Sequence, residues 1–157
     1  MTDVNVRQPT LVVADDDADV RAILVDALRA GGHSVEWEPC GAGLLSRLSR
    51  VPGPDLVVTD LKMPWLDGLE VLERAERMGL HVPGILCTGF FDHEVRERAE
   101  RLDVPILQKP LDLARLRQAV SRGLDEALWT EPEHDGYEPI RRRTRRDRWV
   151  GGLDSPR

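Results

Sequence analysis

Short apolar runs alternate with segments of helical periodicity along most of the chain. Nearly continuous apolar stretches at residues 10–14, 56–58, 82–87 and 104–108 predict buried strands. Residues 34–38 alternate apolar and charged side chains, which predicts a strand near the edge of a sheet. A segment with an apolar helical face follows each strand. This alternation predicts an α/β fold, a doubly wound parallel sheet of five strands with helices on both faces.

Two of the predicted helices differ in how much apolar surface they offer. The first should bury one face, which consists of Val20, Ile23, Leu24, Ala27 and Leu28. The fourth, at residues 92–102, is rich in charge, and its apolar stripe consists of Val95, Ala99 and Leu102. Because so narrow a stripe buries little surface, we expect this helix to be mobile or to face a partner.

The strand that begins at Leu56 ends in the acidic residue Asp60, and the residues after it interrupt regular structure. Pro64 cannot continue a strand in the middle of a sheet. Asp67 is a suitable N-cap for the next helix, whose apolar face begins at Leu69. The sequence therefore predicts that Asp60 lies at the tip of a strand, beside a loop and a helix N-terminus.

This segment resembles the phosphoacceptor segment of the response-regulator receiver domain of two-component signal transduction, whose pattern is Asp-x-x-Met-Pro-x-x-Asp-Gly. The fixed residues of that pattern correspond to Asp60, Met63, Pro64, Asp67 and Gly68. The family's acidic pair, switch hydroxyl and Lys-Pro pair, which usually has a cis peptide bond, correspond to Asp15-Asp16, Thr88 and Lys109-Pro110. The resemblance covers residues 10–124 and implies a flavodoxin-like receiver fold with strand order 2-1-3-4-5.

In that strand order the first and third strands are neighbours, so Asp15, Asp16 and Asp60 should converge at one edge of the sheet. Two carboxylates ~4 Å apart repel each other by roughly 4 kcal/mol at an effective dielectric constant of ~20. The cluster therefore requires a cation, and a hard ion with oxygen ligands, Mg²⁺ above all, fits it. The alternative is that these aspartates only cap a helix.

The resemblance also implies a mechanism. Asp60 would accept a phosphoryl group from a sensor histidine kinase or a phosphotransfer protein, while Lys109 offsets the developing charge. Thr88 would then move to bond the phosphoryl oxygens and thereby change the binding of a downstream protein target. The implied Mg²⁺ ligands are Asp15, Asp16, Asp60 and the backbone carbonyl of Lys62. The protein would catalyse only its own phosphorylation and dephosphorylation, and would not be an enzyme with a separate substrate.

Two positions near this site leave alternatives open. Many family members have Tyr or Phe three positions before the lysine, and this chain has Ile106 there. Phe90 and Phe91 are candidate substitutes for that ring, or they are simple anchors of their loop. The Lys62 side chain is either a solvated loop residue or a shield at the rim of the site.

Composition limits the class of protein. The net charge is −6, which argues against nucleic-acid binding by the whole molecule, and 41% apolar residues suffice for a core. The sequence contains neither an apolar run of the ~18 residues that span a membrane nor a basic, apolar leader, so we expect a cytoplasmic protein without membrane partners. Cys40 and Cys87 have no metal-ligand spacing, and we expect both to be reduced thiols.

Three segments follow from this pattern: an N-terminal arm at residues 1–9, a receiver domain at 10–128 and a flexible charged tail at 129–157. We expect no DNA-binding effector domain. The tail contains an arginine-rich stretch, Arg141–Arg148, followed by Trp149. It is a solvated tail, a docking segment for an acidic protein partner, or an adaptor for nucleic acid, the last being disfavoured by its nearby acidic residues.

A different class of function also remains open. An aspartate-nucleophile phosphatase likewise uses a carboxylate after a strand, with a hydroxyl and a lysine at later strand ends. Asp15, Thr88 and Lys109 would take those roles. This reading leaves the Asp60 segment without a purpose.

Overall fold

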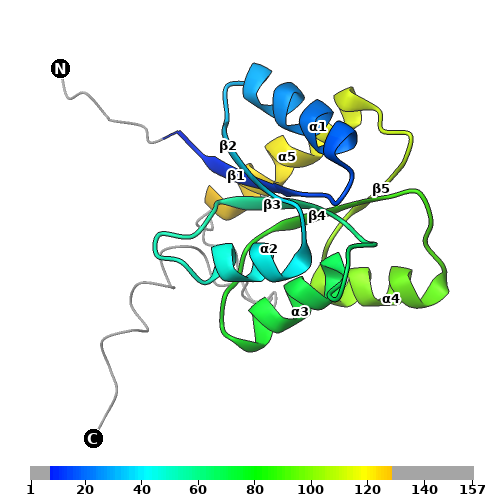
Figure 1. The fold of residues 1–157 in the computed structure, drawn as a ribbon. Helices are drawn as coiled ribbons and strands as arrows, with labels where there is room; N and C mark the ends of the chain where they lie inside the picture. The colour runs from blue at the N-terminus through cyan, green and yellow to red at the C-terminus, as the bar shows by residue number, and fades with distance from the viewer. Residues whose placement is uncertain (1–7, 129–157) are drawn as a thin grey trace, which may run out of the picture.

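The structure, a computed structural model, describes residues 8–128, so the predictions for residues 1–7 and for the tail at 129–157 lie outside the described residues (Figure 1). The strands are β1 (Thr10–Ala14), β2 (Ser34–Glu38), β3 (Leu56–Asp60), β4 (Gly84–Thr88) and β5 (Ile106–Gln108). The helices are α1 (Ala18–Ala30), α2 (Gly41–Leu48), α3 (Gly68–Arg77), α4 (His93–Leu102) and α5 (Leu113–Leu128). Each of these helices is too short or too polar to cross a lipid bilayer.

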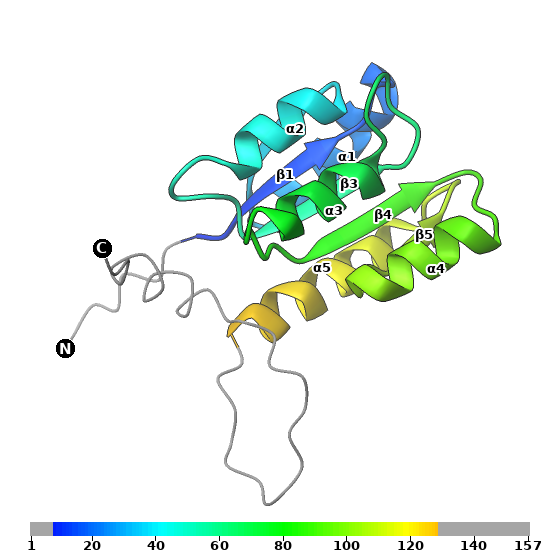
Figure 2. The same cartoon turned by 90° about the horizontal axis from the view of Figure 1, so that it is seen from below.

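All strand pairs are parallel, and the strand order is β2-β1-β3-β4-β5. The predicted fold class and strand order are therefore confirmed, and the alternating β2 lies at an edge. Helices α1 and α5 cover one face of the sheet, while α2, α3 and α4 cover the other (Figures 1 and 2). Each face has its own apolar core, because successive residues of the central strands point to opposite sides.

Two strands begin later than the apolar pattern predicted. Residues 82–83 and 104–105 precede β4 and β5 without belonging to them, since Pro83 and Pro105 lack the N–H that a ladder needs. Their carbonyls still join the sheet. The Pro83 oxygen accepts a hydrogen bond from the Val57 N–H at 2.9 Å, and the Pro105 oxygen accepts one from the Leu86 N–H at 2.9 Å.

The predicted inward position of Ile23 is wrong. Its side chain is 57% exposed, whereas Leu24, Val25 and Leu28 are buried against the sheet. One residue corresponds to about 100° around a helix, so a small rotation of α1 brings Val25 inward and turns Ile23 to solvent. The apolar spacing predicted the helix but not the arc that contacts the sheet.

Candidate functional site

Three carboxylates meet where the central strands end. Asp15 and Asp16 follow β1, Asp60 ends β3, and these two strands are paired neighbours in the sheet. One carboxylate oxygen from each lies within 4.8 Å of the others. Asp15 is buried, Asp60 is partly buried and Asp16 is exposed. The group is thus open to solvent on one side.

Lys109, which directly follows β5, provides a positive charge to this group. Its Nζ lies 2.9 Å from Oδ2 of Asp15 and 3.3 Å from Oδ2 of Asp60. The Lys109 N–H donates to the Thr88 carbonyl at 2.9 Å, and the Lys109-Pro110 peptide bond is cis. Three carboxylates and one ammonium leave an excess of negative charge, which suits a divalent cation with oxygen ligands.

The pKa values of Asp60 and Lys109 are shifted by burial and by the close approach of these charged groups. Burial, followed by the charge of Asp15, raises the pKa of Asp60 even though Lys109 opposes the shift. Burial alone would lower the pKa of Lys109, but its hydrogen bond to Asp15 and the charge of Asp60 outweigh burial and raise that pKa. Lys109 therefore remains protonated at neutral pH, and the free energy of the site would fall further if a cation joined the carboxylates.

Local hydrogen bonds hold the acidic turn after β1. Asp17 is the N-cap of α1, and its side chain accepts hydrogen bonds from the N–H groups of Asp19 and Val20. The Asp17 N–H in turn donates to Oδ1 of Asp15 at 3.0 Å. Both oxygens of Asp15 are thus engaged, one by this N–H and one by Lys109.

The loop after β3 is equally constrained. Oδ1 of Asp60 accepts the Leu61 N–H at 2.7 Å, and Asp67 caps α3 in a capping box with Glu70, as the sequence predicted for Asp67. Gly68 approaches the strand so closely that a Cβ there would lie 2.1 Å from the Asp60 carbonyl oxygen. Between them, Trp65 adopts a left-handed φ of 70° and is 99% exposed.

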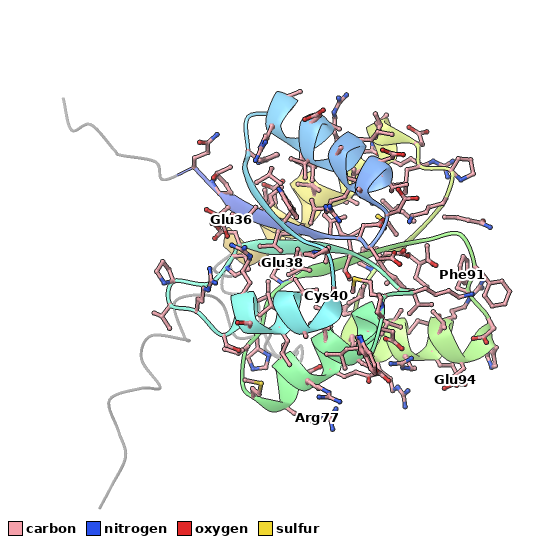
Figure 3. The ribbon with its side chains drawn as sticks, in the orientation of Figure 1. Glu36, Glu38, Cys40, Arg77, Phe91 and Glu94 are labelled. Carbon is pink, nitrogen blue, oxygen red and sulfur yellow. The ribbon has the colours of Figure 1, made fainter. Side chains whose placement is uncertain are left out.

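Thr88 ends β4 beside this group and is buried. Its hydroxyl donates to the Phe90 carbonyl at 3.0 Å and accepts the Phe90 N–H at 3.4 Å, so it is held by its own loop. The ammonium of Lys62 lies 5.3 Å from the centre of the Phe90 ring, so this exposed lysine contacts the β4–α4 connection. Phe91 extends outward beside α4, with the guanidinium of Arg96 5.3 Å from its ring centre (Figure 3).

Two arginines, Arg21 and Arg98, contact residues of the site, and the sequence pattern did not predict these contacts. Arg21 donates to the Asp15 carbonyl at 2.8 Å, and Arg98 on α4 reaches Asp67 at 3.4 Å. Asp67 and Arg98 are 31 positions apart, so no local pattern could reveal their contact. Arg21 lies only six positions after Asp15, but helical periodicity does not report a bond to a carbonyl outside the helix.

Comparisons with known proteins relate the chain to receiver domains. A family model described as the response regulator receiver domain matches residues 11–121. The chain is 31% identical over 115 residues to the response regulator receiver protein CpdR of Brucella abortus, which covers 73% of this chain and 95% of CpdR. It is 36% identical over 117 residues to the transcriptional regulatory protein PrrA of Mycobacterium tuberculosis, covering 73% of this chain and 49% of PrrA. The chain therefore spans about half the length of PrrA.

A solved structure has the same fold. The CheY-like response regulator receiver domain protein of Methanospirillum hungatei matches with a TM-score of 0.70 and 23% sequence identity, covering 76% of this chain and 96% of that one. At this level of identity the likeness establishes the fold alone.

Proposed function

The chain belongs to the response-regulator receiver-domain family, and on that premise we propose that it is a signalling switch that accepts a phosphoryl group on Asp60. The observation that carries the proposal is the convergence of Asp15, Asp16, Asp60 and Lys109 at one sheet edge. Asp60 is easier to reach than Asp15, because its side chain is 12% exposed whereas that of Asp15 is 0% exposed. The donor is a sensor histidine kinase or a phosphotransfer protein.

The positions of these groups support the following transfer. A carboxylate oxygen of Asp60 attacks the phosphorus in line, the phosphorus–nitrogen bond of the donor phosphohistidine breaks, and the imidazole nitrogen takes the electron pair. Lys109, whose Nζ lies 3.3 Å from Oδ2 of Asp60, would offset the negative charge of the phosphoryl oxygens that arrive beside it. The residues that would hold Mg²⁺ are Asp15, Asp16, Asp60 and the backbone carbonyl of Lys62. Bound Mg²⁺ would offset the negative charge of the carboxylates and of the incoming phosphoryl group.

The response begins at Thr88. When its hydroxyl turns toward the phosphoryl oxygens, it gives up its hydrogen bond to the Phe90 carbonyl. The connection between β4 and α4 is then free to rearrange, and the surface around α4 changes. We propose that a downstream protein target reads this change.

Intact-mass measurement tests the assignment. The protein is incubated with Mg²⁺ and acetyl phosphate, and we expect an adduct of about 80 Da, the mass of one phosphoryl group. Asp60→Asn should abolish the adduct, and EDTA should prevent it in the wild type. Asp26→Asn is the matched control, because Asp26 is an exposed aspartate on α1. An adduct that persists in Asp60→Asn would overturn the proposal.

Comparison of Asp60→Asn with Asp15→Asn tests the phosphatase alternative. A phosphatase that uses Asp15 would turn over a phosphate ester in Asp60→Asn but not in Asp15→Asn. The complete burial of Asp15 and the engagement of both its oxygens disfavour that role.

A further inference from the structure

Arg21 connects the acidic turn after β1 to the edge strand β2. It lies in the second turn of α1, where its N–H donates to the Asp17 carbonyl at 2.9 Å. Its Nη1 donates to the carbonyl of Asp15 at 2.8 Å. The Cζ atom of the same guanidinium lies over the ring of Trp37 on β2, 4.4 Å from the ring centre. Trp37 is 47% exposed, so this arginine covers part of an otherwise solvated ring.

This contact constrains the backbone that carries both acidic residues. Apart from Arg21, the Asp15 backbone is held by its N–H, which donates to the Glu38 carbonyl at 3.3 Å. The Asp16 side chain is exposed, so its direction depends on the path of the turn. A guanidinium can donate in its plane and stack with its face at the same time, whereas an ammonium cannot do both.

We propose that Arg21, supported by the ring of Trp37, is a positioning residue that holds the Asp15-Asp16 turn in the geometry needed for Mg²⁺. This inference rests on the proposed function, because it concerns the same metal site. Arg21 does not touch the metal or the phosphoryl group. It acts through the carbonyl of Asp15, and Trp37 acts through Arg21.

The charge of Arg21 and its position predict opposite effects on Mg²⁺ affinity when Arg21 is replaced. A guanidinium bonded to the Asp15 carbonyl would repel a cation bound by the nearby carboxylates, so loss of the charge alone would tighten Mg²⁺ binding. Loss of positioning would instead weaken it, since groups that orient metal ligands change affinity by roughly 10–100-fold when they are removed. The sign of the change therefore separates the two roles.

The experiment follows the backbone amides of Asp15 to Asp17 by ¹H–¹⁵N NMR during a Mg²⁺ titration. We expect Arg21→Lys, Arg21→Gln and Trp37→Leu each to raise the Kd for Mg²⁺ by about tenfold. Trp37→Phe, which keeps an aromatic face, should bind within about twofold of the wild type. Arg29→Gln is the matched control, because Arg29 is also on α1 and also donates to a backbone carbonyl. That carbonyl belongs to Val35 on β2, the strand that carries Trp37.

The outcomes are distinct. Tighter binding in Arg21→Gln, or unchanged binding in Arg21→Lys and Trp37→Leu, overturns the positioning role. An equal loss of Mg²⁺ affinity in Arg29→Gln also overturns the positioning role, because it would indicate a general effect of helix α1. The spectra also report the fold, and if both Arg21 variants unfold, the comparison of Trp37→Leu with Trp37→Phe decides. A wild type that shows no Mg²⁺ shifts in these amides would contradict the proposed metal site itself.

Discussion

The Nε of Arg98 on α4 lies 2.8 Å from Oε1 of Glu73 on α3. The same guanidinium reaches Asp67, the N-cap of α3, at 3.4 Å. Ala99 is the one fully buried residue of α4, and Val95 and Leu102 are only partly buried, so the charged contacts of Arg98 supplement a narrow apolar interface. The hydrogen bond to Glu73 raises the pKa of Arg98, which remains charged at every physiological pH. Through Asp67, α4 is joined to the loop that follows Asp60.

Arg98→Leu should therefore loosen α4. We expect the free energy of unfolding to fall by about 1–2 kcal/mol, because Asp67 and Glu73 lose a charged hydrogen-bond donor that is 15% exposed. Urea denaturation measures the change. Arg115→Leu is the control, since Arg115 is 78% exposed and its Nε lies 3.9 Å from Asp112; its loss should cost less than about 0.5 kcal/mol. Equal effects in the two variants would contradict the anchoring role of Arg98.

The raised pKa of Asp60 makes its charge a cost to folding when no cation is bound. The folded protein holds the Asp60 proton more tightly than the unfolded chain, so stability falls as the pH rises through the range that begins near 3.8. Asp60→Asn, which cannot ionise, should be more stable than the wild type at pH 7 without Mg²⁺, and the gain should shrink toward pH 3.

Mg²⁺ should reverse this order at pH 7. A tenfold excess over the dissociation constant adds about 1.4 kcal/mol to the wild type, while a variant that binds the ion poorly gains less. Denaturation curves with and without Mg²⁺ at both pH values provide the measurement. A wild type with a higher free energy of unfolding than Asp60→Asn in EDTA at pH 7 would contradict this prediction.

Cys87 should resist thiol reagents in the folded protein. It is 1% exposed, and burial raises its pKa to about 12, so the reactive thiolate is scarce. Cys40 is partly exposed and serves as the internal control. Peptide mapping after brief treatment with iodoacetamide at pH 8 should find Cys40 modified and Cys87 intact, and both modified in urea. Equal rates of modification of Cys40 and Cys87 in the folded protein would contradict the buried position of Cys87.

Gly68→Ala should disturb the phosphoacceptor loop. The added Cβ would lie 2.1 Å from the Asp60 carbonyl oxygen and 2.8 Å from Oγ1 of Thr59, so the backbone must move. We expect a loss of about 2 kcal/mol in the free energy of unfolding, together with slower formation of the phosphoryl adduct. At Gly89 the nearest atom to an added Cβ is 4.0 Å away, so Gly89→Ala should leave stability almost unchanged. Thermal unfolding of the two variants compares them directly.

The sequence by itself determined the features that depend on near neighbours in the chain. Apolar runs and helical spacing identified the strands and helices, and the segment from Asp60 to Gly68 identified the loop and the Asp67 cap. These features could be predicted because strand pleating, helix periodicity and capping each act over a few residues. Prolines shifted the starts of β4 and β5, which shows that the apolar pattern is a weaker guide to element ends.

Only the tertiary structure decided which side chains meet. Lys109 contacts Asp15 across 94 positions of sequence, Arg98 reaches Glu73 across 25, and Arg21 lies against Trp37 on another element. Ile23 faces solvent because the packing of α1 on the sheet selected a different arc. Such contacts depend on how whole elements pack, and a single side chain contributes too little to that packing for its position to be read from its neighbours in the chain.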